Sequence, residues 1–419
     1  MTTKELIRQN AVRHKEADKP FNPYTGEGAP LEREWLEIKD FYLPRQHVPK
    51  DMLTHPLIIS VLAAGGIQGF INQMEEPYTP ENREFMVNSL IKVRIEYDFF
   101  YWAASISKIK PKRGGSSIPF ILNRPQRRLV ERYERMRLKG VPIRLILLKA
   151  RQWGGSTATQ LYMAWIQLVH REGWYSAIVA QDSSTARKIK AMYTKLLDEY
   201  PPILLGLKDN AKLEFGSYEG STNDSIIKQS GKKVRDTVVS VGSIMAPNSI
   251  RGGDIAMAHF SEVGIWKSTE EWNASNIIRS VSGAILNEPM TMIVYESTAN
   301  GTGNFFHDEW LRAKKEVGDP EKSSMEPLFV SWFEIEMYSM KFKSEKDKIA
   351  FAHWLIDNRD NDKPNGASDP GKYYWWLWTI GATLENIHWY VNKRKDFESH
   401  ADMASEYPSD DIEAFKHSG

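Results

Sequence analysis

Between residues 140 and 335, short apolar segments alternate with stretches that have the spacing of amphipathic helices. The apolar segments are rich in β-branched and large aliphatic residues and are short, which is typical of buried strands. They are residues 145–148, 176–180, 237–244, 255–260, 290–295 and 328–332. Strands that alternate with helices through short connections form parallel sheets. The pattern therefore predicts an α/β fold with a predominantly parallel sheet flanked by helices.

Helical spacing is clearest after residue 155, where Leu161, Trp165, Leu168 and Val169 form a one-sided apolar stripe. The polar cluster at 181–184 is typical of a helix N-cap. Further helices are predicted at residues 79–109, 127–137, 183–200, 305–315 and 384–397. The polar, Gly- and Ser-rich stretch 212–236 predicts loops or a small hairpin.

The chain is long enough for two or three domains. A mostly helical N-terminal region, residues 1–115, ends in a basic turn with two glycines, and the predicted sheet occupies residues 116–335. Residues 336–419 are charged and poor in strand signals, and they contain an aromatic cluster at 373–378. Such a cluster is either a base-stacking surface or part of a packed core or domain interface, and two adjacent tryptophans favour a core or an interface.

Composition narrows the function further. The 55 basic and 54 acidic residues nearly cancel, so DNA binding would need a local patch such as 108–113 or 393–395. The absence of cysteine excludes disulfides, thiolate metal sites and thiol nucleophiles. The longest apolar run, 57–67, is shorter than the roughly 20 residues that span a bilayer.

The segment 143–157, IRLILLKARQWGGST, carries the strongest chemical signal. An apolar strand passes through a Gly turn into a helix start, where free N–H groups bind anions and glycine allows close approach. This predicts a phosphate site for a nucleoside triphosphate, although any strand-turn-helix connection needs such glycines. The usual motif ends in Gly-Lys-Ser/Thr, and Gly155 stands at the lysine position. Either Lys149 or Arg151 can supply the missing cation.

Hydrolysis of a phosphoanhydride needs Mg²⁺, a cationic or N–H cradle, and a carboxylate for the attacking water. Ser156 offers a hydroxyl to Mg²⁺, and Glu262 offers a carboxylate directly after a buried strand. Three apolar strands end in polar residues near 149, 261 and 297, where parallel sheets bind ligands. Gln126, after Pro125, can donate and accept as adenine recognition requires, but a solvated helix start is the simpler explanation.

Taken in order, these segments resemble the ATPase part of the large terminase subunit, the motor that packages DNA into the proheads of tailed bacteriophages. Residues 125–126 resemble its adenine-reading motif and residues 149–157 its Walker A loop. Residues 249–252 with 255–262 resemble its Walker B region, and 297–301 its coupling motif. Residues 405–415 resemble the segment that closes the ATPase half.

The resemblance implies an additional-strand (ASCE) P-loop NTPase fold with a C-terminal linker subdomain. It also implies roles: Lys149 would hold phosphate in place of the usual lysine, Arg151 would sense the γ-phosphate in its own or a neighbouring subunit, and Glu262 would activate water. The implied ATP-binding residues are Gln126, Lys149, Arg151, Gln152, Gly154, Gly155, Ser156 and Thr157. The implied coupling residues are Ser297, Thr298, Ala299, Asn300 and Gly301.

The same resemblance implies ATP as substrate and Mg²⁺ as cofactor, with Ser156 as a metal ligand. It implies double-stranded DNA, the portal protein and the small terminase subunit as partners, self-association into a ring, and no membrane. The protein would work in the host cytoplasm, transiently at the procapsid portal, and would be absent from the mature virion. Relatives continue into a nuclease domain about where this chain ends, so an ATPase half without nuclease activity is expected.

Two residues depart from the family pattern. Gly155 removes the standard lysine, and Ser261 stands where the Walker B aspartate usually supports Mg²⁺. Serine is neutral and would act from the second layer around the metal. These departures predict slow hydrolysis or dependence on neighbouring subunits, or an alternative function as a nucleotide- and DNA-binding assembly or docking module. A helicase-like enzyme on the same fold is a third hypothesis, against which the coupling segment argues mildly.

Overall fold

A computed structural model describes residues 1–111, 114–221, 223–244, 254–266, 274–361 and 371–417. Among these residues, eight strands form one mixed sheet in the order β12-β5-β11-β10-β6-β9-β8-β7. Neighbours from β12 to β9 are parallel, and β8 and β7 add an antiparallel hairpin at one edge. The strands are β5 (Ile143–Lys149), β6 (Tyr175–Ala180), β7 (Leu213–Ser217), β8 (Asp224–Gln229), β9 (Lys232–Ser243), β10 (Ile255–Ser261), β11 (Met292–Ser297) and β12 (Glu326–Val330). The predicted parallel sheet and hairpin are confirmed.

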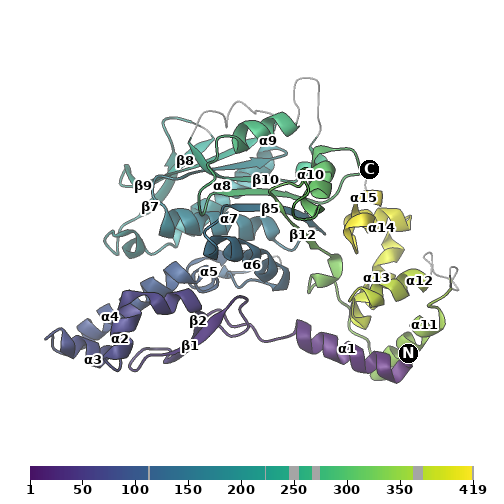
Figure 1. Ribbon diagram of the computed structural model, residues 1–419, viewed down its shortest axis with the longest axis horizontal. Coiled ribbons are helices and arrows are strands. Elements are labelled where there is room, and N and C mark those ends of the chain that lie inside the picture. Colours follow the sequence, from purple (N-terminus) through teal and green to yellow (C-terminus); the bar gives the residue numbers. More distant parts are fainter. Residues whose placement is uncertain (112–113, 222, 245–253, 267–273, 362–370, 418–419) are drawn as a thin grey trace.

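Helices cover both faces of this sheet (Figure 1). In β5, Leu145 and Leu147 belong to one core and Ile146 and Leu148 to the other, as strand alternation requires. Burial on both faces explains the near-continuous apolar strands. The first core packs α5 (Phe99–Ile106), α6 (Arg124–Leu138), α7 (Gly155–Trp165) and α8 (Ser183–Asp198), and the second packs α9 (Ala274–Ser282) and α10 (Phe305–Lys314).

Two helix predictions need correction. The stripe after residue 155 forms α7 and then a π-helix, η2 (Ile166–His170). The single helix predicted for 79–109 is wrong: the chain breaks at Asp98 between α4 (Pro80–Tyr97) and α5. Asp98 leaves the helical conformation because its carboxylate accepts from the N–H of Tyr101 and so caps α5.

A separate small core lies in the N-terminal region. The hairpin β1 (Arg33–Glu37) and β2 (Arg45–Pro49) packs with η1 (Lys50–Thr54), α2 (Pro56–Ala63), α3 (Ile67–Gln73) and α4. Within the described residues, no single helix is long and apolar enough to cross a membrane. Only α2 and α3 together, bent by 94°, have the length and composition to do so.

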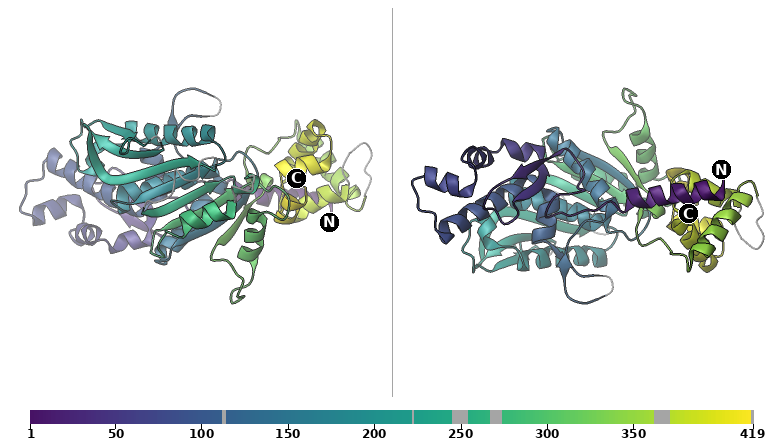
Figure 2. Two further views of the ribbon diagram at one scale, coloured as in Figure 1. Left: turned by 90° about the horizontal axis from the view of Figure 1, so that it is seen from above. Right: turned by 90° about the horizontal axis from the view of Figure 1, so that it is seen from below.

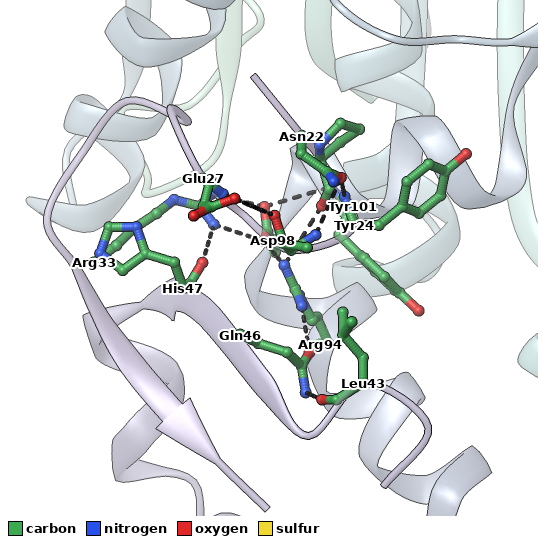
Figure 3. A network of polar contacts seen from close by, with 12 residues as sticks. Asn22, Tyr24, Glu27, Arg33, Leu43, Gln46, His47, Arg94, Asp98 and Tyr101 are labelled. Atoms are coloured by element: carbon green, nitrogen blue, oxygen red, sulfur yellow. Dashed lines mark hydrogen bonds and ion pairs between the residues drawn. The ribbon is translucent and has the colours of Figure 1, made fainter. Parts of the chain in front are cut away.

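An ion triad ties this hairpin to α4 and α5 (Figure 3). Arg33 donates two hydrogen bonds of 2.9 Å to Asp98, and Arg94 Nη2 lies 3.2 Å from the same carboxylate. All three side chains are almost inaccessible to solvent. Burial would raise the pKa of Asp98, but the two arginines outweigh it and lower that pKa below its usual value.

The first helix, α1 (Thr3–Ala17), lies beside the C-terminal helices (Figures 1 and 2). Asn10 donates to Glu385, and Arg13 donates to the carbonyls of Trp378 and Ala382. The remaining helices are η3 (Pro202–Leu205), η5 (Val263–Ile265), η6 (Trp332–Glu334), α11 (Glu345–Asp357), α12 (Gly371–Thr379), α13 (Leu384–Lys393), η7 (Arg394–Asp396), α14 (His400–Glu406) and α15 (Asp411–His417), and β3 (Lys108–Ile109) pairs with β4 (Ile118–Pro119). The domain boundaries given above stay a prediction.

The aromatic cluster at 373–378 belongs to α12. Tyr374, Leu377 and Trp378 are buried in the larger core, and Tyr373, Trp375 and Trp376 pack against it. The packed-core interpretation of this segment is therefore confirmed.

Candidate active site

The loop between β5 and α7 surrounds a cavity of about 500 Å³. Its backbone is left-handed at Gln152 (φ 65°) and at Gly154 (φ 80°), the N-cap residue of α7. Gly154 has no side chain to accept the N–H groups of the first helical turn, so these donors are available to an anion. The cavity is lined by Lys149, Gln152, Trp153, Gly154, Gly155 and Ser156.

Packing explains why position 155 is glycine. A Cβ atom on Gly155 would lie 2.8 Å from the indole ring of Trp153, closer than real contacts allow. Trp153 is itself buried. The space that a lysine side chain at the usual loop position would need is therefore occupied by an aromatic ring.

Lys149 supplies a cation at the other end of the loop. Its ammonium lies 3.0 Å from Glu262 Oε1 and 3.1 Å from Glu296 Oε1. Burial alone would lower the pKa of Lys149, but the carboxylates of Glu296 and Glu262 raise it above its usual value. Lys149 is therefore a protonated, almost buried charge beside the cavity.

Glu296, which sequence reasoning missed, lies at the centre of the site. It is fully buried at the end of β11. Its Oε1 accepts a 2.5 Å hydrogen bond from the Ser156 hydroxyl, and its Oε2 lies 2.7 Å from His259 Nε2. Burial would raise the pKa of Glu296, but Lys149 and hydrogen bonds from His259 and Ser156 lower it to about 2. One signal was available: Glu296 directly follows an apolar strand, as Lys149 does.

Glu262 follows β10 in a left-handed conformation, with φ 58° and ψ 41°. This conformation is uncommon for residues other than glycine and is found at functional sites. The carboxylate is partly open to solvent, with 30% of the side chain exposed. Besides Lys149, it accepts a 3.4 Å hydrogen bond from the backbone N–H of Thr298.

The predicted coupling segment lies beside Glu262. Ser297 is buried, and its hydroxyl accepts a 2.9 Å hydrogen bond from the N–H of Gly264. Farther along, Asn304 donates to the carbonyls of Asn300 and Gly301, while Ala299 is buried. The segment thus contacts the carboxylate loop through Ser297 and Thr298. Its coupling role stays a prediction.

Gln126 supports the loop from α6. Its carbonyl oxygen accepts from the N–H of Asn123 at 2.9 Å. Its amide donates to the carbonyls of Trp153 and Gly154 at 3.1 and 3.0 Å. Both ends of this nearly buried side chain are therefore engaged by the protein in this structure. Adenine recognition by Gln126 stays a prediction.

Arg151 points to the C-terminal helices. Its guanidinium forms an ion pair with Glu406 of α14, and its carbonyl accepts a 2.9 Å hydrogen bond from the hydroxyl of Tyr338. About half of the Arg151 side chain is exposed. The segment 405–415 therefore contacts the loop, and the phosphate role of Arg151 stays a prediction.

The remaining predicted residues have the following places. Thr157 lies half-buried in the first turn of α7, and Ser261 ends β10 with its carbonyl bonded to Trp266 Nε1. Residues 249–252 lie outside the described residues, as do Lys112 and Arg113 of the first basic patch. Among the patch residues that the structure describes, Lys108 pairs with Glu199, and Lys393 pairs with Asp396.

A larger cavity of about 650 Å³ lies between α1, α6 and the C-terminal helices. Its lining mixes both signs of charge, and Arg128 and Glu334 form an ion pair there at 2.5 Å. It contains no glycine-rich loop. The smaller cavity, where Lys149 meets two carboxylates, is therefore the better candidate for catalysis.

No family model and no curated protein match this chain. Its structure is similar to solved structures of phage large terminases. The ATPase domain of the Thermus phage P74-26 large terminase matches at 15% identity and a TM-score of 0.34, covering 53% of this chain and 84% of that chain. The HK97 bacteriophage large terminase matches at 13% identity and a TM-score of 0.41, covering 62% and 51%.

The large terminase of another, thermophilic bacteriophage, solved in complex with ADP, matches at 12% identity and a TM-score of 0.34. That match covers 55% of this chain and 49% of the ADP-bound chain. This chain thus spans about half the length of the HK97 protein and of the ADP-bound terminase.

Proposed function

We propose that this chain is the ATPase motor of a viral genome-packaging terminase, which hydrolyses ATP to move double-stranded DNA into a procapsid. The observation that carries the proposal is the meeting of Lys149 and Glu262 beside the N-terminus of α7. A cation, free N–H groups and a carboxylate are the parts that phosphoanhydride hydrolysis requires. We also assign the ASCE type, because β11 lies between β5 and β10 as an additional strand.

In this mechanism, the N–H groups of the first turn of α7 and the ammonium of Lys149 bind the phosphates of ATP. Phosphate competes with Glu262 for Lys149, and the released carboxylate then orients the attacking water and accepts its proton. The oxygen of this water bonds to the γ-phosphorus while the bond from that phosphorus to the bridging oxygen breaks. ADP leaves with the bridging oxygen, and Glu262 returns the proton to the released phosphate.

The residues around Ser156 fit Mg²⁺. A hydroxyl at the start of α7, held against a buried carboxylate, presents the oxygen ligands that this ion prefers. When bound, Mg²⁺ would neutralise phosphate charge. Within the described residues, no group of three or more His, Asp or Glu side chains is arranged to hold a metal. Nucleotide phosphates would therefore complete the coordination.

We extend the proposal to the partners. Arg151 senses the γ-phosphate after leaving Glu406, and residues 297–301 transmit hydrolysis to DNA movement. Double-stranded DNA binds through basic patches, and the subunits form a ring on the portal protein with help from the small terminase subunit. This assembly forms in the host cytoplasm.

The test is ATP turnover with and without double-stranded DNA. Glu262→Gln should lower turnover by a factor of about 10² to 10⁴, which is typical for loss of a general base. Glu316→Gln, which removes an exposed carboxylate outside the cavity, is the matched control and should behave like the unmodified chain. Undiminished turnover in Glu262→Gln would eliminate its role.

Lys149→Ala tests the displaced cation. Loss of ATP affinity and turnover is expected, since no side chain can replace it from position 155. If both survive, Arg151 becomes the better candidate. Nucleotide binding by the unmodified chain without turnover, even with DNA and portal present, would instead support the alternative docking module.

A further inference from the structure

Glu296 has no step of its own in the proposed mechanism. Three groups from three elements converge on its carboxylate: Lys149 from β5, Ser156 from α7 and His259 from β10. None of its side chain is exposed. A buried carboxylate is costly unless it is fully paired, so this arrangement needs a reason.

Strand register brings Glu296 beside Ser261. Ser261 and Glu296 are directly paired residues on the parallel strands β10 and β11. Paired residues on neighbouring strands lie on the same face of a sheet, about 4.8 Å apart. Glu296 therefore provides, from the neighbouring strand β11 and on the same face of the sheet, a carboxylate that Ser261 lacks. The glutamate side chain is also longer than that of an aspartate.

The carboxylate of Glu296 is held between Ser156 and His259. Glu296 Oε1 accepts the hydroxyl hydrogen of Ser156, so the oxygen lone pairs of that serine stay free. His259 holds the other carboxylate oxygen at 2.7 Å and so limits rotation of the side chain. His259 is itself fully buried. The group is thus oriented from both sides.

We infer that Glu296 replaces the aspartate absent at Ser261 and is a positioning residue that orients the Ser156 hydroxyl toward nucleotide-bound Mg²⁺. This inference rests on the proposed function. The neutral Ser261 then does not mean that the site lacks this carboxylate, because Glu296 on the neighbouring strand β11 supplies it.

The test is a Mg²⁺ titration of the binding of a fluorescent ADP analogue, compared with binding in excess EDTA. Glu296→Gln should raise the Mg²⁺ concentration for half-saturation about 10-fold or more, as for other partners of metal ligands. Binding in EDTA should change much less. Equal changes in both conditions would mean a merely structural role and would overturn the inference.

Relocating the acid makes the test stricter. Glu296→Gln combined with Ser261→Asp returns a carboxylate to the face of β10 and should recover most of the lost Mg²⁺ response. If the Mg²⁺ response of this double variant does not recover, the inference that Glu296 takes the place of an acid at position 261 is overturned. Glu296→Asp covers the case in which the glutamine variant does not fold, because it keeps the charge beside Lys149 but shortens the reach to Ser156. An unchanged Mg²⁺ response in Glu296→Asp would also overturn the inference.

Glu309→Gln is the matched control. Glu309 of α10 is another buried carboxylate that accepts from a serine hydroxyl, that of Ser323, and it does not line the cavity. Its substitution should leave the Mg²⁺ response unchanged, and an equal shift would overturn the inference. If the unmodified chain binds no nucleotide with Mg²⁺, the proposed function fails first; if it binds and only the Glu296 effects are missing, only this inference fails.

Discussion

The buried charge networks around Asp98 and around Glu296 differ in their access to solvent. Around Asp98, Arg33 and Arg94 are at most 2% exposed, and backbone carbonyls of Pro23 and His47 accept further hydrogen bonds (Figure 3). Around Glu296, Lys149 is also almost buried, but Glu262 is 30% exposed and Lys149 lines a cavity.

The difference separates a structural role from a chemical one. In the closed network, the carboxylate of Asp98 has already exchanged water for protein partners, so a ligand gains nothing there. The network around Glu296 ends in a lysine and a carboxylate that a phosphate can separate. Because little solvent reaches this network, the electrostatic interactions between its charges are strong, and its open edge lets a substrate contact them.

The largest expected effect comes from breaking the closed network. Asp98→Asn leaves two arginines buried without a counter-charge and should lower the free energy of unfolding by about 3–5 kcal/mol. Denaturant titration measures this, with Glu37→Gln as control, because Glu37 and its partner Arg45 are both exposed. A midpoint for Asp98→Asn equal to that of the control would contradict the structural role.

The dependence of stability on pH should show that Glu296 is ionised in the folded protein. Folding lowers the pKa of Glu296 from 4.5 to about 2. The ionised carboxylate therefore adds its full share to the free energy of unfolding above pH 4.5, and this share is lost as the pH falls toward 2. The pKa shift of Glu296 contributes about 3 kcal/mol to the free energy of unfolding, and about 2 kcal/mol of this should be lost by pH 3. Stability measured from about pH 6 to about pH 3 should therefore fall more steeply for the unmodified chain than for Glu296→Gln. Equal slopes would contradict a buried, ionised Glu296.

A smaller loss of stability is expected where Trp153 packs against Gly155. Gly155→Ala places a methyl group against the Trp153 ring and should cost about 1–3 kcal/mol, with weaker nucleotide binding. Gly216→Ala is the control, because its Cβ would meet only ordinary contacts, at 3.5 Å from Lys228. Thermal unfolding of both variants measures the difference. Equal melting temperatures would mean that the ring yields easily.

The smallest effect is expected at the surface. Arg151 and Glu406 pair with 54% and 32% of their side chains exposed, so Glu406→Gln should cost less than about 1 kcal/mol. Its denaturation midpoint, measured beside that of Asp98→Asn, compares an exposed pair with a buried one. A loss as large as that of Asp98→Asn would show that the contact between the loop and α14 is a main support of the fold.

Local patterns were enough to predict much of the sheet and the loop. The apolar runs 145–148, 255–260 and 290–295 predict strands that the structure has at 143–149, 255–261 and 292–297, because burial on both faces selects apolar residues at most positions. The apolar pattern does not predict the break at Asp98, because helical spacing continues through it and the partner Arg33 lies in a hairpin that is distant in the sequence.

The site shows the same limit. Lys149, Ser156 and Glu262 were predicted from their positions at element ends, and the structure brings Lys149 into contact with Glu262. Glu296 was passed over, because a polar residue after a strand is ordinary until its neighbours are known. Gln126 and Arg151 were predicted to face the nucleotide, and here they contact the loop backbone and Glu406.

By itself, the sequence determined where most strands, turns and helices lie and which side chains stand near their ends, since periodicity and capping act over a few residues. Only the tertiary structure decided that β11 lies between β5 and β10, that Ser261 is paired with Glu296, and that Trp153 covers Gly155. Strand order and register depend on burying both faces of the whole sheet at once, and no local segment contains that information.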